Sequence, residues 1–154
     1  MRNKVIFDLD GTLANIEKRR KMSQLDNGKI DWDVFFKPEN IWFDTPNEPV
    51  IKMAQMLHST HQIIILSGRS KATKDETKRW LNKHGVPYDV LKMRPTNREW
   101  HYMPDDDLKK HWLDTLFPGD KKDSILCVFD DRDKVVKMWR ENGLTCFQVA
   151  EGNF

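Results

Sequence analysis

Short apolar runs rich in β-branched residues alternate along this chain with segments of helical periodicity. The runs that we interpret as strands are Lys4 to Phe7, Gln62 to Leu66, Ser124 to Phe129 and Thr145 to Val149, with Tyr88 to Leu91 as a weaker fifth. Apolar residues at helical spacing lie between them, over Glu48 to Ser59, Lys71 to Lys83, Asp106 to Phe117 and Asp131 to Asn142. Such alternation predicts an α/β fold of three layers, Rossmann-like, in which a mainly parallel sheet has helices on both faces.

The length of 154 residues is that of one domain, so we expect residues 1–154 to form a single unit. One stretch, at about residues 14–45, breaks the alternation of strand and helix. It carries aromatic residues among polar ones, including Trp32, Phe35 and Trp42. We therefore interpret it as a small insertion with its own apolar cluster.

Composition excludes some classes of protein and leaves others open. Charged residues make up 32% of the chain, and no apolar run approaches the roughly 18 residues that span a bilayer, so we expect no membrane segment. The amino terminus has no signal-peptide pattern, which favours a cytoplasmic location. The net charge of +2 is too small to predict nucleic-acid binding by itself. Cys127 and Cys146 lie in apolar segments, so we expect both to be reduced and buried.

Polar residues follow three of the predicted strands. Asp8 and Asp10 come after Lys4 to Phe7, Ser67-Gly68-Arg69 after Gln62 to Leu66, and Asp130-Asp131 after Ser124 to Phe129. Ligands of open α/β sheets bind beyond the carboxyl ends of the strands, so these residues converge if the strands are neighbours. Clustered carboxylates repel each other unless a cation such as Mg²⁺ neutralises them. The pattern predicts a metal-assisted phosphate site.

Each of these motifs, taken alone, also has an ordinary structural explanation. Asp8 to Gly11 could form a self-capping turn, and Asp130-Asp131 could cap a helix. A lysine on an amphipathic helix, such as Lys110, is usually a surface residue. The order of the motifs along the chain favours the functional interpretation.

That order resembles the haloacid dehalogenase (HAD) superfamily. The segment from Val5 to Leu13 is similar to its motif I, Ile63 to Ser67 to motif II, a lysine between Asp106 and Leu113 to motif III, and Val128 to Asp131 to motif IV. A closer resemblance is to the 3′-phosphatase domain of phage-type polynucleotide kinase-phosphatases. It rests on the motif I segment extended to Ala14, on Ser67-Gly68-Arg69, on Asp106 to Lys110, on Asp130 to Arg140 and on Cys146 to Phe154.

The resemblance implies a role for each residue. Asp8 is the nucleophile that forms an aspartyl-phosphate, and Asp10 is the general acid and base. Mg²⁺ is held by the Asp8 carboxylate, the Asp10 main-chain carbonyl, Asp130 and Asp131. The resemblance leaves open which of Asp130 and Asp131 contacts the metal directly. It also leaves open whether the metal is Mg²⁺ or Mn²⁺. The residues expected to bind substrate are Thr12, Arg19, Ser67, Gly68, Arg69 and Asp106.

The lysine of motif III is ambiguous, because Lys109 and Lys110 are adjacent. We favour Lys110, since Asp106 lies four residues before it on the same helix face and can orient its ammonium. Arg19 and Arg69 match arginines near the substrate of the phage-type phosphatases, where a guanidinium can bind phosphate in a bidentate manner.

The leading hypothesis is a phosphatase that removes a 3′-phosphate from DNA or RNA ends, because a short insertion leaves room for a polynucleotide. Alternatives are a phosphatase of 3′- or 5′-mononucleotides and a non-catalytic module that binds nucleic-acid ends. The chain has no Gly-x-x-x-x-Gly-Lys-Ser/Thr loop, so we expect no kinase activity. A separate kinase or ligase acting on the same ends is implied by the resemblance.

Overall fold

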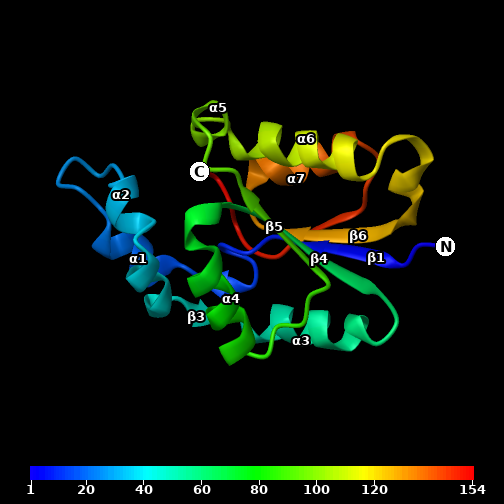
Figure 1. The fold of residues 1–154 in the computed structure, drawn as a ribbon, viewed down its shortest axis with the longest axis horizontal. Helices are drawn as coiled ribbons and strands as arrows, with labels where there is room; N and C mark the ends of the chain where they lie inside the picture. The colour runs from blue at the N-terminus through cyan, green and yellow to red at the C-terminus, as the bar shows by residue number, and fades with distance from the viewer.

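A parallel sheet of five strands forms the centre of the computed structural model, which describes residues 1–154. Its order is β5-β4-β1-β6-β7, with every neighbouring pair parallel. The strands are β1 (Lys4–Phe7), β4 (Gln62–Ser70), β5 (Val90–Arg94), β6 (Ile125–Asp130) and β7 (Cys146–Gln148). All strands therefore present their carboxyl ends at the same edge, at the left in Figure 1. The predicted α/β class and mainly parallel sheet are confirmed.

Helices cover both faces of the sheet (Figure 1). One layer contains α3 (Glu48–His58) and α4 (Lys74–Lys83), and the other contains α6 (Asp105–Leu116) and α7 (Asp133–Glu141). Short elements connect them: α5 (Arg98–His101) and the 3₁₀ helices η2 (Lys71–Thr73) and η3 (Gly119–Ser124).

The strands alternate their side chains between two hydrophobic cores, as the two-residue period of a strand requires. In β4, Ile63 and Ile65 pack into the core beneath α3 and α4. Ile64 and Leu66 pack into the core beneath α6 and α7. The near-continuous apolar run is thus explained by burial of the strand on both faces.

The predicted insertion forms a small lobe beside the carboxyl ends of the strands, at the left of Figure 1. It contains β2 (Ala14–Asn15), α1 (Glu17–Met22), α2 (Trp32–Phe35), η1 (Pro38–Phe43) and β3 (Thr45–Pro46). The antiparallel pairing of β2 with β3 closes its base. Trp32, Phe35 and Phe36 pack against one another inside it, so the expected aromatic cluster is present.

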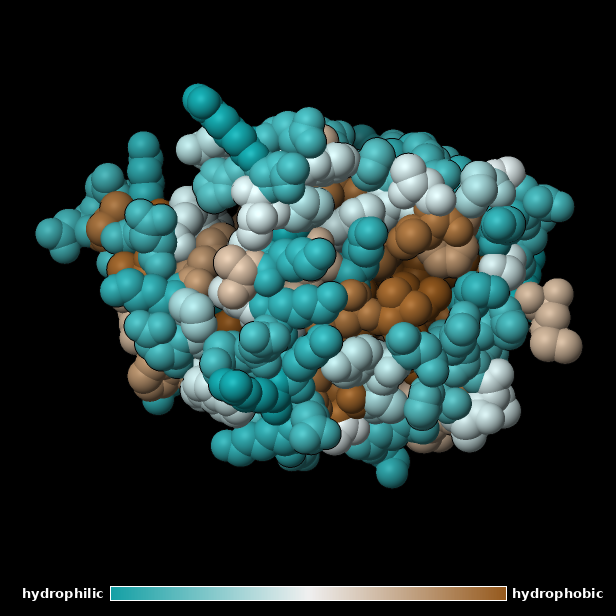
Figure 2. Space-filling model, viewed as in Figure 1, coloured by the Kyte–Doolittle hydropathy of each residue, from teal (hydrophilic) through white to brown (hydrophobic).

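The surface is mostly hydrophilic in Figure 2, with one apolar patch over the strands between α3 and α6. None of the helices combines the length and the apolar character that crossing a bilayer requires. Cys127 and Cys146 are buried free thiols, as expected.

Candidate active site

Three carboxylates meet where β1 and β6 end side by side. Asp8 directly follows β1, whereas Asp130 ends β6 and Asp131 follows it. Their oxygens lie within 4.8 Å of one another, and all three residues are buried. The convergence predicted from the sequence therefore occurs, because the two strands are parallel neighbours.

Lys109 supplies the positive charge in this cluster. Its Nζ lies 2.7 Å from Oδ1 of Asp8 and 3.0 Å from Oδ2 of Asp130. Burial alone would lower the pKa of this lysine, but Asp130 and Asp8 outweigh that effect and raise it. The ammonium is thus kept charged beside the Asp8 carboxylate.

The same cluster has an excess of negative charge. Burial raises the pKa of Asp8 well above its usual value, and repulsion from Asp130 and Asp131 raises it further. The attraction of Lys109 lowers this pKa but does not cancel the rise. Burial likewise raises the pKa of Asp131. Three carboxylates and one ammonium leave two uncompensated charges if all ionise. Oxygen donors with that charge suit a hard divalent cation, so the residues present fit Mg²⁺.

Neighbouring groups hold the carboxylates in place. The hydroxyl of Thr12 lies 3.2 Å from oxygens of both Asp8 and Asp131. The indole Nε1 of Trp139 donates to Oδ2 of Asp130 at 3.1 Å. A Cβ at Gly11, which has a φ of +83°, would overlap the Asp131 carboxylate. Thr12, expected to bind substrate, instead contacts the two acids from a fully buried position.

The preference for Lys110 and Asp106 is wrong. Lys110 lies on the outer side of α6 and pairs with Asp114, and the side chain of Asp106 makes no hydrogen bond or ion pair. One residue corresponds to about 100° of helix rotation, so Lys109 faces the site while Lys110 faces away. Lys109 shares the buried stripe of Trp112 and Leu113, three and four residues later. That stripe is the sequence signal that distinguishes the two lysines.

Asp105 occupies the position expected of Asp106, and the sequence pattern did not single it out. Its carboxylate accepts hydrogen bonds from Arg94 at 2.6 Å and from Arg132 at 3.2 Å. Arg94 also donates to main-chain oxygens of Gly68, Trp100 and Met103, so it fixes the start of α6 to β4 and to the preceding loop. This network positions the helix that carries Lys109.

The predicted substrate residues of β4 lie inside that strand. The strand extends beyond Leu66 to Ser70, and its register with β5 shifts between Ser67 and Ser70. Ser67 is buried, and its Oγ accepts a hydrogen bond from the main-chain nitrogen of Arg69. A Cβ at Gly68 would lie 2.5 Å from Oδ1 of Asp105, so a glycine permits this close approach.

Asp10 belongs to a second cluster, separate from the three acids. Its Oδ1 accepts from Nη2 of Arg19 at 2.8 Å and from Nε and Nη2 of Arg69 at 2.8 and 2.5 Å. Burial would raise the pKa of Asp10, but the charges and hydrogen bonds of Arg69 and Arg19 lower it to about 2. Asp10 is therefore ionised and held between two guanidiniums.

Asp44, which no sequence motif marks, completes this second cluster. Its Oδ2 lies 2.9 Å from Nη2 of both Arg19 and Arg69, and both arginines are buried. Burial raises the pKa of Asp44 to about 6 despite these two arginines. Asp10 and Asp44 hold the guanidiniums of Arg19 and Arg69, and a contact of either arginine with substrate phosphate stays a prediction.

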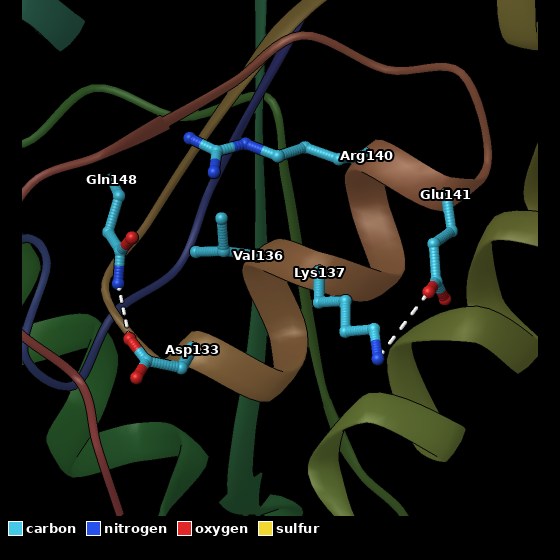
Figure 3. Close-up of a pocket in the computed structure, with 6 residues that line it drawn as sticks. All are labelled: Asp133, Val136, Lys137, Arg140, Glu141 and Gln148. Carbon is cyan, nitrogen blue, oxygen red and sulfur yellow. Dashed lines mark hydrogen bonds and ion pairs between the residues drawn. The ribbon is translucent and has the colours of Figure 1, made fainter.

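One surface hollow is lined by none of the three acids. It has a volume of about 410 Å³ and is lined by Asp133, Val136, Lys137, Arg140, Glu141 and Gln148. Figure 3 shows that Gln148 donates a hydrogen bond to Asp133 and that Lys137 forms an ion pair with Glu141. The catalytic candidates are thus grouped at the strand ends and not in this hollow.

The parallel sheet with carboxylates beyond β1 and β6 has the fold of the HAD class. A HAD-like hydrolase from Streptococcus pneumoniae has the same fold, with a TM-score of 0.65 and 16% identity over 95% of this chain and 83% of that one. Within this class, the family described as the polynucleotide kinase PNKP phosphatase domain matches residues 2–154. The chain belongs to this family, in agreement with the resemblance seen in the sequence.

Other similar proteins are longer than this chain. A chain of the Pnkp1/Rnl/Hen1 complex is 34% identical with a TM-score of 0.77, over 100% of this chain and 48% of its own length. A chain of a second structure, that of the Pnkp1/Rnl/Hen1 RNA repair complex, is 36% identical with a TM-score of 0.75, over 98% of this chain and 43% of its own length. A putative bifunctional polynucleotide kinase/RNA ligase of Autographa californica nuclear polyhedrosis virus is 29% identical over 95% of this chain and 19% of its own length. This chain thus spans less than half of each of these three relatives.

Proposed function

We propose that this chain removes a 3′-phosphate from polynucleotide ends through a covalent intermediate on Asp8. The observation that supports this most strongly is the Asp8 carboxylate, buried beside Asp130 and Asp131 and 2.7 Å from the Lys109 ammonium. A carboxylate in this setting can act as a nucleophile toward phosphorus, and it divides a difficult hydrolysis into two easier steps.

The metal in this proposal is Mg²⁺, held by Asp8, Asp130, Asp131 and the main-chain carbonyl of Asp10. When bound, it neutralises charge on the carboxylates and on the phosphoryl oxygens. Lys109 stabilises the negative charge that develops on the phosphoryl group during transfer. Ser67, in the neighbouring strand β4, donates a hydrogen bond from its hydroxyl to a phosphoryl oxygen.

Asp10 has the second role in the reaction. Its lowered pKa keeps Asp10 ionised, which is the protonation state that accepts a proton from the water attacking phospho-Asp8, but it also makes the paired Asp10 a weak base. Its first task, protonating the leaving oxygen, requires a proton that the paired Asp10 does not hold near neutral pH. In this proposal the proton reaches Asp10 from the monoanionic form of the substrate phosphate, whose second pKa is about 6, once substrate binding has loosened the contact of Asp10 with Arg19 or Arg69.

The substrate class is proposed from the family and from the small insertion. The family is described as the polynucleotide kinase PNKP phosphatase domain. Two of the similar structures are of a Pnkp1/Rnl/Hen1 complex, and one of them is named as an RNA repair complex. We propose RNA or DNA ends as substrates, with a kinase and a ligase acting on the same ends, since the viral relative is named as a kinase/ligase. We attribute no kinase step to this chain, which carries no loop of that class.

The test is phosphate release from 3′-phosphorylated RNA and DNA oligonucleotides, compared with 3′- and 5′-mononucleotides. Each substrate is assayed with Mg²⁺, with Mn²⁺ and with a chelator. The proposal predicts a higher kcat/KM on an oligonucleotide than on any mononucleotide and no release in the chelator. Higher kcat/KM on mononucleotides would support the nucleotidase alternative, and binding without turnover would support an end-binding module.

A further inference from the structure

Two arginines beside the candidate site meet at the ring of Phe154. The guanidinium Cζ of Arg20, in α1, lies 4.7 Å from the ring centroid, and that of Arg132, before α7, lies 5.3 Å from it. The two groups come from opposite parts of the chain, the insertion and the loop after β6. Phe154 itself is 41% exposed, so this pair of cations faces solvent.

Each arginine is adjacent in sequence to a residue of one of the two charge clusters. Arg20 follows Arg19, which binds Asp10. Arg132 follows Asp131, and its Nη1 donates to Asp105. The contacts with Phe154 place the pair where the insertion, the loop after β6 and the C-terminal segment meet.

The C-terminal segment holds this arrangement in place. Nε of Arg132 donates to the main-chain oxygen of Phe154 at 2.7 Å. The main-chain nitrogen of Asp133 donates to the oxygen of Gly152 at 2.9 Å. A Cβ at Gly152 would overlap the main chain of Asp131, so the segment packs directly on the loop of the acidic pair. Cation–π contacts with the ring then hold both guanidiniums close together.

The charge of this pair is only partly balanced. Arg20 has no ion pair or side-chain hydrogen bond, and Nη2 of Arg132 makes no hydrogen bond. Like charges held close together favour an anion between them, and guanidiniums bind phosphate oxygens well. A polynucleotide end differs from a mononucleotide in having a further phosphate, the phosphodiester that precedes the terminal nucleotide.

We propose that Arg20 and Arg132, held by Phe154, bind the phosphodiester that precedes the terminal nucleotide and so favour strand ends over mononucleotides. The inference rests on the proposed function, because it concerns the same site. This subsite is distinct from Arg19, whose guanidinium is buried and paired with Asp10 and Asp44.

The experiment compares kcat/KM on a 3′-phosphorylated dinucleotide with that on the 3′-mononucleotide. A third substrate is the same dinucleotide with an uncharged methylphosphonate linkage. The wild type should favour the charged dinucleotide about tenfold or more, as expected of charged hydrogen bonds. Arg20→Ala should lower the preference for the charged dinucleotide to about the preference that the wild type shows for the methylphosphonate dinucleotide over the mononucleotide. The loss should come mainly from a higher KM for the charged dinucleotide. Phe154→Ala should lower the same preference.

The matched control is Lys21→Ala, since Lys21 is exposed on the same helix and pairs with Glu17. It should keep the wild-type ratio. An unchanged ratio in Arg20→Ala, or equal rates of the wild type on charged and uncharged dinucleotides, would overturn the subsite while leaving the phosphatase proposal standing. A wild type that hydrolyses none of the three substrates would overturn both.

Discussion

Nζ of Lys109 lies 2.7 Å from Oδ1 of Asp8, although the two residues are 101 positions apart in the sequence. The contact joins α6 to the end of β1 across the core that both elements share. It fixes a positive charge on the carboxylate that we propose as nucleophile. Burial of both partners makes this contact sensitive to any change of side-chain length or charge.

Replacement of Lys109 should therefore stop the reaction. Lys109→Ala is expected to lower kcat by about 100-fold or more, the usual effect of removing a group that stabilises the transition state. Lys110→Ala is the control, because it removes only an exposed pair with Asp114. Phosphate release under saturating substrate measures both variants. A larger loss in Lys110→Ala would mean that Lys110, and not Lys109, faces the reacting phosphate.

Asp44 should be needed for stability as well as for activity. Asp44→Ala removes the oxygens that accept hydrogen bonds from Arg19 and Arg69, and leaving buried guanidiniums without a partner costs about 3–5 kcal/mol. Urea unfolding measures the free energy of unfolding, with Asp33→Ala in the exposed part of α2 as a control. A loss below about 1 kcal/mol, the size of a surface effect, would argue against a structural role for this cluster.

The stability of the metal-free protein should fall as pH rises from about 4 to 6. Asp44 has a raised pKa of about 6, and the pKa values of Asp8 and Asp131 are also raised. The folded state then binds more protons than the unfolded state, so ionisation disfavours folding across this range. The opposite contribution of Asp10, with a pKa of about 2, changes only at lower pH.

Thermal unfolding in chelator over a pH series tests this dependence. Added Mg²⁺ should raise Tm more at pH 7 than at pH 5, because the cation binds the ionised carboxylates. Asp130→Asn should weaken that metal effect. A Tm that rises steadily with pH in chelator would contradict the assignment.

Gly152 should matter for metal binding although it is far from Asp8 in sequence. Gly152→Ala places a Cβ against the main chain of Asp131 and Arg132, so this loop must shift. We expect a several-fold higher Mg²⁺ concentration for half-maximal activity. Asn153→Ala, at the next position and exposed, serves as the control. The same Mg²⁺ dependence in Gly152→Ala and wild type would show that the loop tolerates the shift.

The sequence was sufficient to predict the sheet and the meeting of the three acids. Parallel strands end at one edge, so Asp8, Asp130 and Asp131 had to approach each other once β1 and β6 were neighbours. The choice between Lys109 and Lys110 failed because each has an aspartate four residues earlier, and only the apolar stripe of α6 separates them.

The surroundings of Asp10 depend on tertiary packing that no local pattern records. Arg19 lies in a basic run that is typical of a solvated face, yet the insertion folds it inward against Asp44 and Asp10. The role of Arg94 likewise depends on how the segment after β5 returns to the end of that strand, where the main-chain oxygens of Trp100 and Met103 accept from Arg94.

Trapping phosphate on Asp8 would test the proposed covalent mechanism directly. The enzyme is mixed in excess with an oligonucleotide carrying a labelled 3′-phosphate, quenched with acid, digested and analysed by mass spectrometry. The mechanism predicts label on the peptide that contains Asp8, and neither label nor phosphate release in Asp8→Asn, with the fold intact by circular dichroism. Label on another residue, or phosphate release by folded Asp8→Asn at the wild-type rate, would contradict it.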